Sequence, residues 1–92
     1  MPTRPVITFA HLASGLTFGF WLDRADPTVL HVTARHGTTP EDAIAPFFAG
    51  QTLWDEVHER FETFADTHGL YWFWWENGRR VGVISCFRRE DR

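Results

Sequence analysis

Apolar and polar positions alternate most regularly near the end of the chain, over residues 70–75 and 80–87, where aromatic and β-branched side chains predominate. A period of two is typical of β-strands. Asn77 and Gly78 separate the two runs, and this dipeptide is the strongest short-range hairpin signal, because a type I′ turn needs positive φ at both central positions. The pattern therefore predicts an antiparallel hairpin.

Counting outward from this two-residue loop sets the register of the hairpin: Trp75 faces Arg80, and Tyr71 faces Ile84. Successive side chains of a strand point to opposite faces. One face then carries Leu70, Trp72, Trp74, Val81 and Val83, and the other carries Tyr71, Phe73, Trp75, Arg80 and Ile84. Both faces are rich in rings, which suits either a strand covered by layers on both sides or one face in the core and the other kept for a partner.

Three further strands are predicted upstream. Residues 6–12 and 16–22 alternate in the same way, with a turn signal at Ser14 and Gly15 between them. Residues 29–34 form a third alternating run after a charged turn.

The period then changes to that of helices. Thr39 is the expected N-cap of a helix over residues 40–49, and Pro40 suits its first position, where a missing N–H costs nothing. Apolar residues at helical spacing predict a second helix over residues 52–68, with Thr52 as its N-cap.

The outer face of this predicted second helix is acidic. It carries Asp55, Glu56, Glu59, Glu62 and Asp66. Such a face is usually only solvated. It also suits a basic partner, or imitation of the phosphate spacing of a nucleic acid, as expected of immunity proteins, antitoxins and phage inhibitors.

The element order βββ-αα-ββ predicts a single α+β domain over residues 1–92, with a mostly antiparallel sheet of about five strands and both helices on one face. Hydrophobic residues make up 43% of the 92 residues and aromatic residues 16%, which is enough for a packed core and excludes a disordered chain. A small sheet covered on one side leaves its other face open to a second copy or another protein.

Charge and cysteine content exclude several functional classes. A net charge of −3 argues against binding dominated by a phosphate backbone, and the nine basic residues are all arginine, which excludes lysine chemistry. The lone Cys86 excludes an internal disulfide and a thiolate-rich zinc site. No apolar run approaches the ~20 residues of a membrane span. We expect a cytoplasmic protein with no cofactor and no bound metal.

Nucleotide-binding, zinc-protease, redox and hydrolase motifs are missing from the sequence. The remaining candidates for acid–base chemistry are His31, Arg35 and His36, at the end of a predicted strand and just before a helix. A histidine acting as acid and base, beside an arginine that holds a phosphate, would suit RNA cleavage. The three are better explained as ordinary residues: His31 as an outward strand residue, Arg35 as a solvated side chain and His36 as a loop residue before Gly37.

The rings of Tyr71, Phe73 and Trp75 beside Arg80 resemble in chemistry the platforms on which single-stranded nucleic acids stack. The same residues also suit packing, since Trp75 opposite Arg80 forms a cross-strand cation–π pair without any ligand. Packing, self-association, a protein partner and a nucleic acid remain open here.

Residues 35–43, Arg-His-Gly-Thr-Thr-Pro-Glu-Asp-Ala, resemble the His-Gly-x-(Thr/Ser)-x-Glu-(Glu/Asp)-Ala turn and helix of BrnT-type ribonuclease toxins. The resemblance covers about a tenth of the chain. It implies ribonuclease activity and strands that follow directly after this helix, where the apolar spacing predicts a second helix instead.

The function we expect is that of a small non-enzymatic interaction module, which self-associates or binds and inhibits a protein through the aromatic hairpin and the acidic helix. The alternatives are a nucleic-acid-processing enzyme or toxin-like ribonuclease using His31, Arg35 and His36, and a single-stranded nucleic-acid binder using the hairpin rings.

Overall fold

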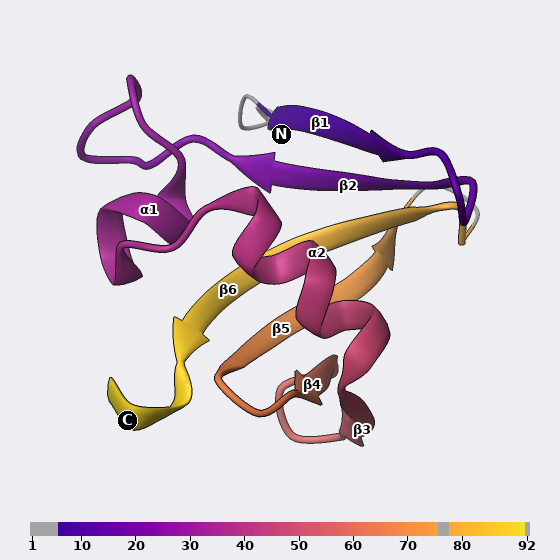
Figure 1. Ribbon diagram of the computed structural model, residues 1–92. Helices are drawn as coiled ribbons and strands as arrows, with labels where there is room; N and C mark the ends of the chain where they lie inside the picture. Colours follow the sequence, from indigo (N-terminus) through magenta and orange to yellow (C-terminus); the bar gives the residue numbers. More distant parts are fainter. Residues whose placement is uncertain (1–5, 76–77, 92) are drawn as a thin grey trace.

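The computed structural model describes residues 6–75 and 78–91, which form one six-stranded sheet with two helices against one of its faces (Figure 1). The strands are β1 (Val6–His11), β2 (Leu16–Trp21), β3 (Gln51–Asp55), β4 (Arg60–Phe64), β5 (His68–Trp75) and β6 (Arg80–Arg88), and the helices are α1 (His31–His36) and α2 (Pro40–Ala49). A single 3₁₀ turn, Arg89–Asp91, ends the described chain. The predicted α+β class is confirmed, with six strands rather than about five.

The strand order in the sheet is β1-β2-β6-β5-β4-β3. Every neighbouring pair is antiparallel except β2 and β6, which run parallel. The sheet twists strongly, so that β1 and β2 run across the view while β3 and β4 are seen nearly end-on (Figure 1). This mixed order places the β1–β2 hairpin beside β6, although the two are far apart in the sequence.

The predicted C-terminal hairpin is formed by β5 and β6. Its register is as predicted from Trp75 opposite Arg80 back to Trp72 opposite Val83. A β-bulge then makes Ile84 an extra residue, so that Tyr71 pairs with Ser85 and not with Ile84. The predicted loop residue Asn77 lies outside the described residues, while Gly78 has the positive φ of 75° that such a turn requires.

The core lies between the sheet and the helices. Its buried apolar members are Phe18, Phe20, Val32, Ala43, Leu70, Trp72, Val81, Val83 and Cys86. They come from β2, β5 and β6 on the sheet side and from α1 and α2 on the helix side. Because Val32 and Ala43 belong to the same buried cluster as these strand residues, both helices pack on one face of the sheet, which we call the helix-bearing face. The opposite face, which we call the helix-free face, is bordered by the end residues of α1, since His31 lines a cavity with Trp21 and Phe73 and His36 packs against Phe87.

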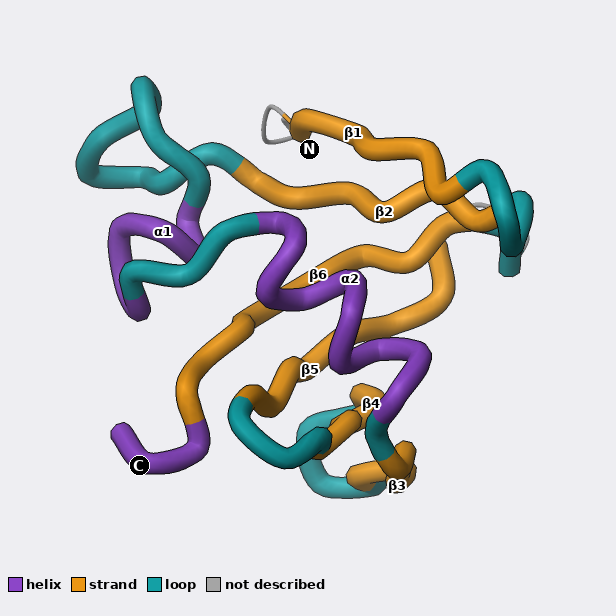
Figure 2. Tube along the Cα trace, viewed as in Figure 1, coloured by secondary structure: helices purple, strands orange, loops and turns teal. Residues whose placement is uncertain are grey.

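The third predicted strand, over residues 29–34, is wrong: a long loop follows β2 (Figure 2), and helix α1 then begins at His31. Gly37 closes this helix with a φ of 68°, and its N–H donates to the Thr33 carbonyl oxygen at 2.9 Å. Basic residues followed by glycine are a helix C-terminal signal, which the alternation over residues 29–34 masked.

Helix α2 forms as predicted. The Thr39 hydroxyl accepts from the Asp42 N–H, and the Asp42 carboxylate accepts from the Thr39 N–H at 2.9 Å, which completes a capping box. Two orphan backbone donors are thus satisfied at the start of the helix, next to the first core residue of α2, Ala43.

The predicted second helix over residues 52–68 is also wrong, because this segment forms the antiparallel strands β3 and β4. Asp55, expected inside the first helical turn, accepts instead from the backbone N–H groups of Val57 and His58 and so builds the turn of a hairpin. Four strands, β3 to β6, therefore follow α2 directly. This is the order that the resemblance to BrnT-type toxins implies.

Candidate functional site

The helix-free face of the sheet carries a row of aromatic rings from β5 and β2. Trp21 stacks on Phe73 with a centroid distance of 5.6 Å and an interplanar angle of 25°. Its indole also lies 5.7 Å from that of Trp75. We call Trp21, Phe73 and Trp75 the ring row. The structure thus joins two predicted binding residues to Trp21, whose place depends on the parallel pairing of β2 with β6.

Two glycines lie beneath the ring row. A Cβ on Gly82 would come within 2.7 Å of Phe73 Cζ, and one on Gly19 within 2.9 Å of Trp75 Cζ3. These rings therefore lie flat against the backbone of the neighbouring strands. As a result Trp21, Phe73 and Trp75 are half-buried by their own chain.

Arginines flank this face. The Arg80 guanidinium lies 5.6 Å from a Trp75 ring centroid, which matches the predicted cation–π pair. Arg60 lies over Tyr71 at 3.7 Å, and its Nη2 pairs with a Glu62 carboxylate oxygen at 3.1 Å. The charge of Arg60 is therefore already matched by a carboxylate on the same strand.

The predicted acidic helix face does not exist, because its members lie on a hairpin and a loop. Asp55 ends β3, Glu56 and Glu59 are in the following turn, Glu62 is in β4, and Asp66 is in the loop after β4. The hydrogen bond from His58, at 2.8 Å, is the main cause that lowers the pKa of the Asp55 carboxyl to about 2. Acidic charge is thus concentrated at the tip of the β3–β4 hairpin.

Of the three catalytic candidates, His31 and Arg35 converge and His36 lies apart. His31 Nδ1 lies 3.1 Å and Arg35 Nε 3.6 Å from the same oxygen of Asp23, a residue that is only 4% exposed. His36 packs instead against Phe87, with a centroid distance of 6.1 Å. The structure therefore builds a cluster of Asp23, His31 and Arg35, in which Asp23 is a member that the sequence did not indicate.

Asp23 is held as a carboxylate. Burial alone would raise its pKa, but hydrogen bonds from the Asp26 N–H, the His31 side chain and the Ala25 N–H outweigh burial, and the pKa lies below its ordinary value. A carboxylate only accepts hydrogen bonds, so His31 donates from Nδ1. Its ring also lines a cavity of about 280 Å³, whose other walls are Trp21, Phe73, Val83 and Ile84.

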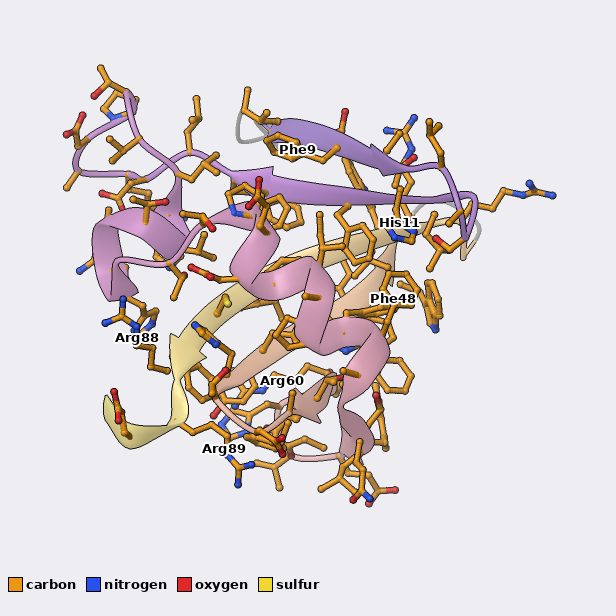
Figure 3. All side chains as sticks on the ribbon, in the orientation of Figure 1. Phe9, His11, Phe48, Arg60, Arg88 and Arg89 are labelled. Carbon is orange, nitrogen blue, oxygen red and sulfur yellow. The ribbon has the colours of Figure 1, made fainter. Side chains whose placement is uncertain are left out.

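Several large apolar side chains are exposed on the helix-bearing side. Phe9 on β1 is 37% exposed, and Phe48, near the end of α2, is 46% exposed. The Phe48 ring stacks on His11 of β1 (Figure 3). Ile7 on β1 and Trp74 on β5 belong to the same group, at 43% and 44%. The two helices therefore leave apolar surface uncovered even on the face where they pack.

Within the described ranges no three His, Cys, Asp or Glu side chains are grouped as a metal site would require. Burial raises the pKa of the Cys86 thiol to about 11, which leaves it unreactive near neutral pH. Among the described elements, neither helix is long and apolar enough to cross a membrane. Comparisons with protein-family models, with curated proteins and with solved structures found no match.

Proposed function

We propose that this chain is a non-enzymatic interaction module that binds protein surfaces, its own or those of another protein, through the helix-free face of its sheet. One observation supports this most strongly: the ring row of Trp21, Phe73 and Trp75 lies on the face opposite the core and stays only half-buried, with the His31 ring of α1 at its border across a cavity. Flat aromatic surfaces flanked by arginine are typical of the centres of protein interfaces.

The charges on this face favour a protein over a nucleic acid. Arg60 is already paired with Glu62 and Asp55, so it adds little net positive charge. The whole chain carries a net charge of −3, whereas phosphate binding draws its affinity from many unmatched cations. A stacking platform for bases would also need rings free to accept a base, and Trp21 and Phe73 stack on each other.

The test combines Phe73→Arg with Trp75→Glu in one double variant. The matched control combines Gln51→Arg with Leu53→Glu, which places the same charges on the same face along β3 and away from the ring row. We expect the wild type and the control to self-associate in sedimentation velocity, or to retain the same partner by affinity capture, and the double variant to lose whichever of these contacts is made through the ring row. Far-UV circular dichroism checks the fold of each variant.

The proposal is wrong if the wild type is monomeric and captures nothing that the double variant loses. It is also wrong if a labelled single-stranded oligonucleotide binds the wild type and the control but not the double variant, since the face would then be a nucleic-acid platform.

A second candidate function is RNA cleavage, favoured by two observations together. The strands β3 to β6 follow α2 directly, as the resemblance to BrnT-type ribonuclease toxins implies, and His31 is held by Asp23 beside a cavity. In this function His31 acts as acid and base, and Arg35 holds a phosphate. His36, the third candidate, lies apart from them.

Cleavage of a fluorescent RNA by purified protein tests this second function. We expect His31→Asn to abolish cleavage and His36→Asn to leave it unchanged, because only His31 belongs to the cluster. Loss of activity in His36→Asn alone would transfer the chemistry to the other end of α1, and no cleavage by the wild type would remove this candidate.

A further inference from the structure

The strand β1 forms one edge of the sheet and lacks the features that usually protect such an edge. All six of its residues, Val6–His11, pair with β2 without a bulge, and none of them is proline, lysine, arginine, aspartate or glutamate. Natural proteins guard exposed edges with charges, prolines, bulges or a covering segment. Within residues 6–75 and 78–91, none of these features protects β1, which leaves its outer edge open to an additional strand.

The hydrogen-bond directions show which backbone groups of β1 face outward. The Thr17 N–H donates to the Arg79 carbonyl oxygen at 3.4 Å, so the backbone groups of Thr17 point toward β6. Directions alternate along a strand, and Thr17 is opposite Ala10. The N–H and C=O groups of Val6, Thr8 and Ala10 therefore point away from β2, and the described part of the chain places no strand there.

We propose that two copies of this chain join along β1, antiparallel and in one register, to form a continuous sheet of twelve strands. The two-fold axis passes between the two Thr8 residues, and Val6 of each copy is opposite Ala10 of the other. This register uses all three outward-facing residues of both strands. It requires no charged pair, because β1 contains no charged residue.

The side chains fit a second copy of the same strand. A two-fold axis normal to the sheet keeps the helix-bearing side of both copies on the same side, so residues of one face meet residues of that face. In this register Ile7 of each copy, 43% exposed, is opposite Phe9 of the other, 37% exposed. Aromatic and β-branched side chains form favourable cross-strand pairs.

A hollow opens on the helix-bearing side, beside the junction of the two β1 strands, which we call the seam. Its volume is about 350 Å³, and it lies between β1 and the first turns of α2. The hollow is lined by Phe9, Leu30, Thr39, Pro40, Glu41 and Ile44. The apolar side chains of an added strand would cover its open side, next to Phe9.

The other edge of the sheet does not fit a second copy in this way. β3 is one residue shorter and ends at Asp55, where Glu56 and Glu59 continue the acidic tip of its hairpin. Two such edges would bring like charges together. Of the two edge strands that the structure describes, β1 alone contains no charged residue, and this asymmetry limits association to a closed dimer.

Cross-linking tests the register directly. Hydrogen-bonded antiparallel pairs have Cα atoms about 5.5 Å apart, within disulfide range. We expect Thr8→Cys to form a covalent dimer rapidly under mild oxidation, since the two cysteines meet at the axis. Leu12→Cys is the matched control: it is 92% exposed, and this register keeps the Leu12 residues of the two copies far apart. The native Cys86 is buried and does not interfere.

Edge-blocking variants test the pairing without cysteine. Thr8→Pro removes an outward N–H and leaves the ladder to β2 intact, and Thr8→Lys places two like charges at the axis. Thr8→Val keeps the N–H and adds no charge. We expect the proline and lysine variants to sediment as monomers with native far-UV circular dichroism, while the valine variant and the wild type sediment as dimers.

These outcomes separate the seam from the ring row. A monomeric wild type, equal cross-linking of both cysteine variants, or a folded lysine variant that stays dimeric would overturn pairing along β1. If only Phe73→Arg with Trp75→Glu dissociates the dimer, the seam is wrong and the helix-free face is the site of self-association. If only the Thr8 variants dissociate it, pairing along β1 holds, and the ring row must be tested by partner capture.

Discussion

The two faces of the β5–β6 hairpin have similar compositions and different surroundings. On one face Leu70, Trp72 and Val83 are buried beneath α1 and α2. On the other, Phe73 and Trp75 are half-buried by Trp21 and by the glycine backbone beneath, and α1 reaches this face at its first residue, His31, across a cavity from Phe73. Aromatic content alone thus does not tell which face of a strand is covered, because the cover comes from elements distant in the sequence.

The largest expected difference between the faces is in stability. Trp72→Ala should lower the free energy of unfolding by about 3–5 kcal/mol, because it opens a cavity in the core and removes the Nε1–H that donates to the Thr63 hydroxyl at 2.8 Å. Phe73→Ala on the ring row should cost about half as much, because that ring is only partly removed from water. Urea unfolding monitored by far-UV circular dichroism measures both. Equal losses would contradict the contrast between the faces.

A smaller effect is expected from adding a methyl group to a glycine beneath the ring row. Gly82→Ala puts a methyl group within 3 Å of the Phe73 and Trp21 rings, which must shift, at a cost of about 1–3 kcal/mol. Near-UV circular dichroism should change as the two rings move. Ser85→Ala, on the same strand and face, is the control and should leave the aromatic signal unchanged.

The charged hairpin β3–β4 gives a pH-dependent effect that the apolar hairpin lacks. The hydrogen bond from His58 holds the pKa of Asp55 at about 2, below its value in the unfolded chain. Asp55 therefore stabilises the fold at pH above that unfolded value, and this contribution is lost as the pH falls through about 2. Asp55→Asn should flatten the fall in melting temperature between about pH 4 and pH 2. An unchanged acid profile would remove Asp55 as its source.

The smallest effect on stability tests the β-bulge at Ile84, because this extra residue decides which of Ser85 and Cys86 faces the core. Cys86 lies on the core face with a pKa of about 11, because burial disfavours the thiolate, whereas its neighbour Ser85 lies on the helix-free face. We expect native Cys86 to resist a thiol reagent at pH 8. Ser85→Cys combined with Cys86→Ala should react readily and change stability little. Rapid labelling of the wild type would contradict the face assigned to Cys86.

Local signals predicted the elements that depend on neighbours in the sequence. The Asn-Gly turn correctly indicated the hairpin and its register as far as Trp72, and Thr39 with Pro40 correctly indicated the start of α2. The bulge at Ile84 was not predicted, because an extra residue does not change the alternation of apolar and polar side chains that precedes it in β6. For the candidate site, the sequence pattern indicates Phe73 and Trp75, whereas Trp21 joins them only through the non-local pairing of β2 with β6.

Residues 52–64 show the limit of periodicity. Leu53, Val57, Phe61 and Phe64 fit a helical repeat, yet the segment is a hairpin, because β4 completes the ladder along β5 and Phe61 stacks on Trp72 at 4.6 Å. Asp23 was missed for a similar reason, since only the fold places it against His31 and Arg35.

The amino-acid sequence by itself determined the aromatic hairpin and the cap of α2. It also determined that the chain has more apolar surface than two short helices can cover. Only the tertiary structure decided which rings lie under the helices, that β2 pairs with β6, and that β1 is an unguarded edge. The physical reason is the separation in sequence of the interacting residues. Turns and caps depend on hydrogen bonds between residues a few positions apart, whereas strand order and the covering of each face depend on contacts between segments far apart in the chain.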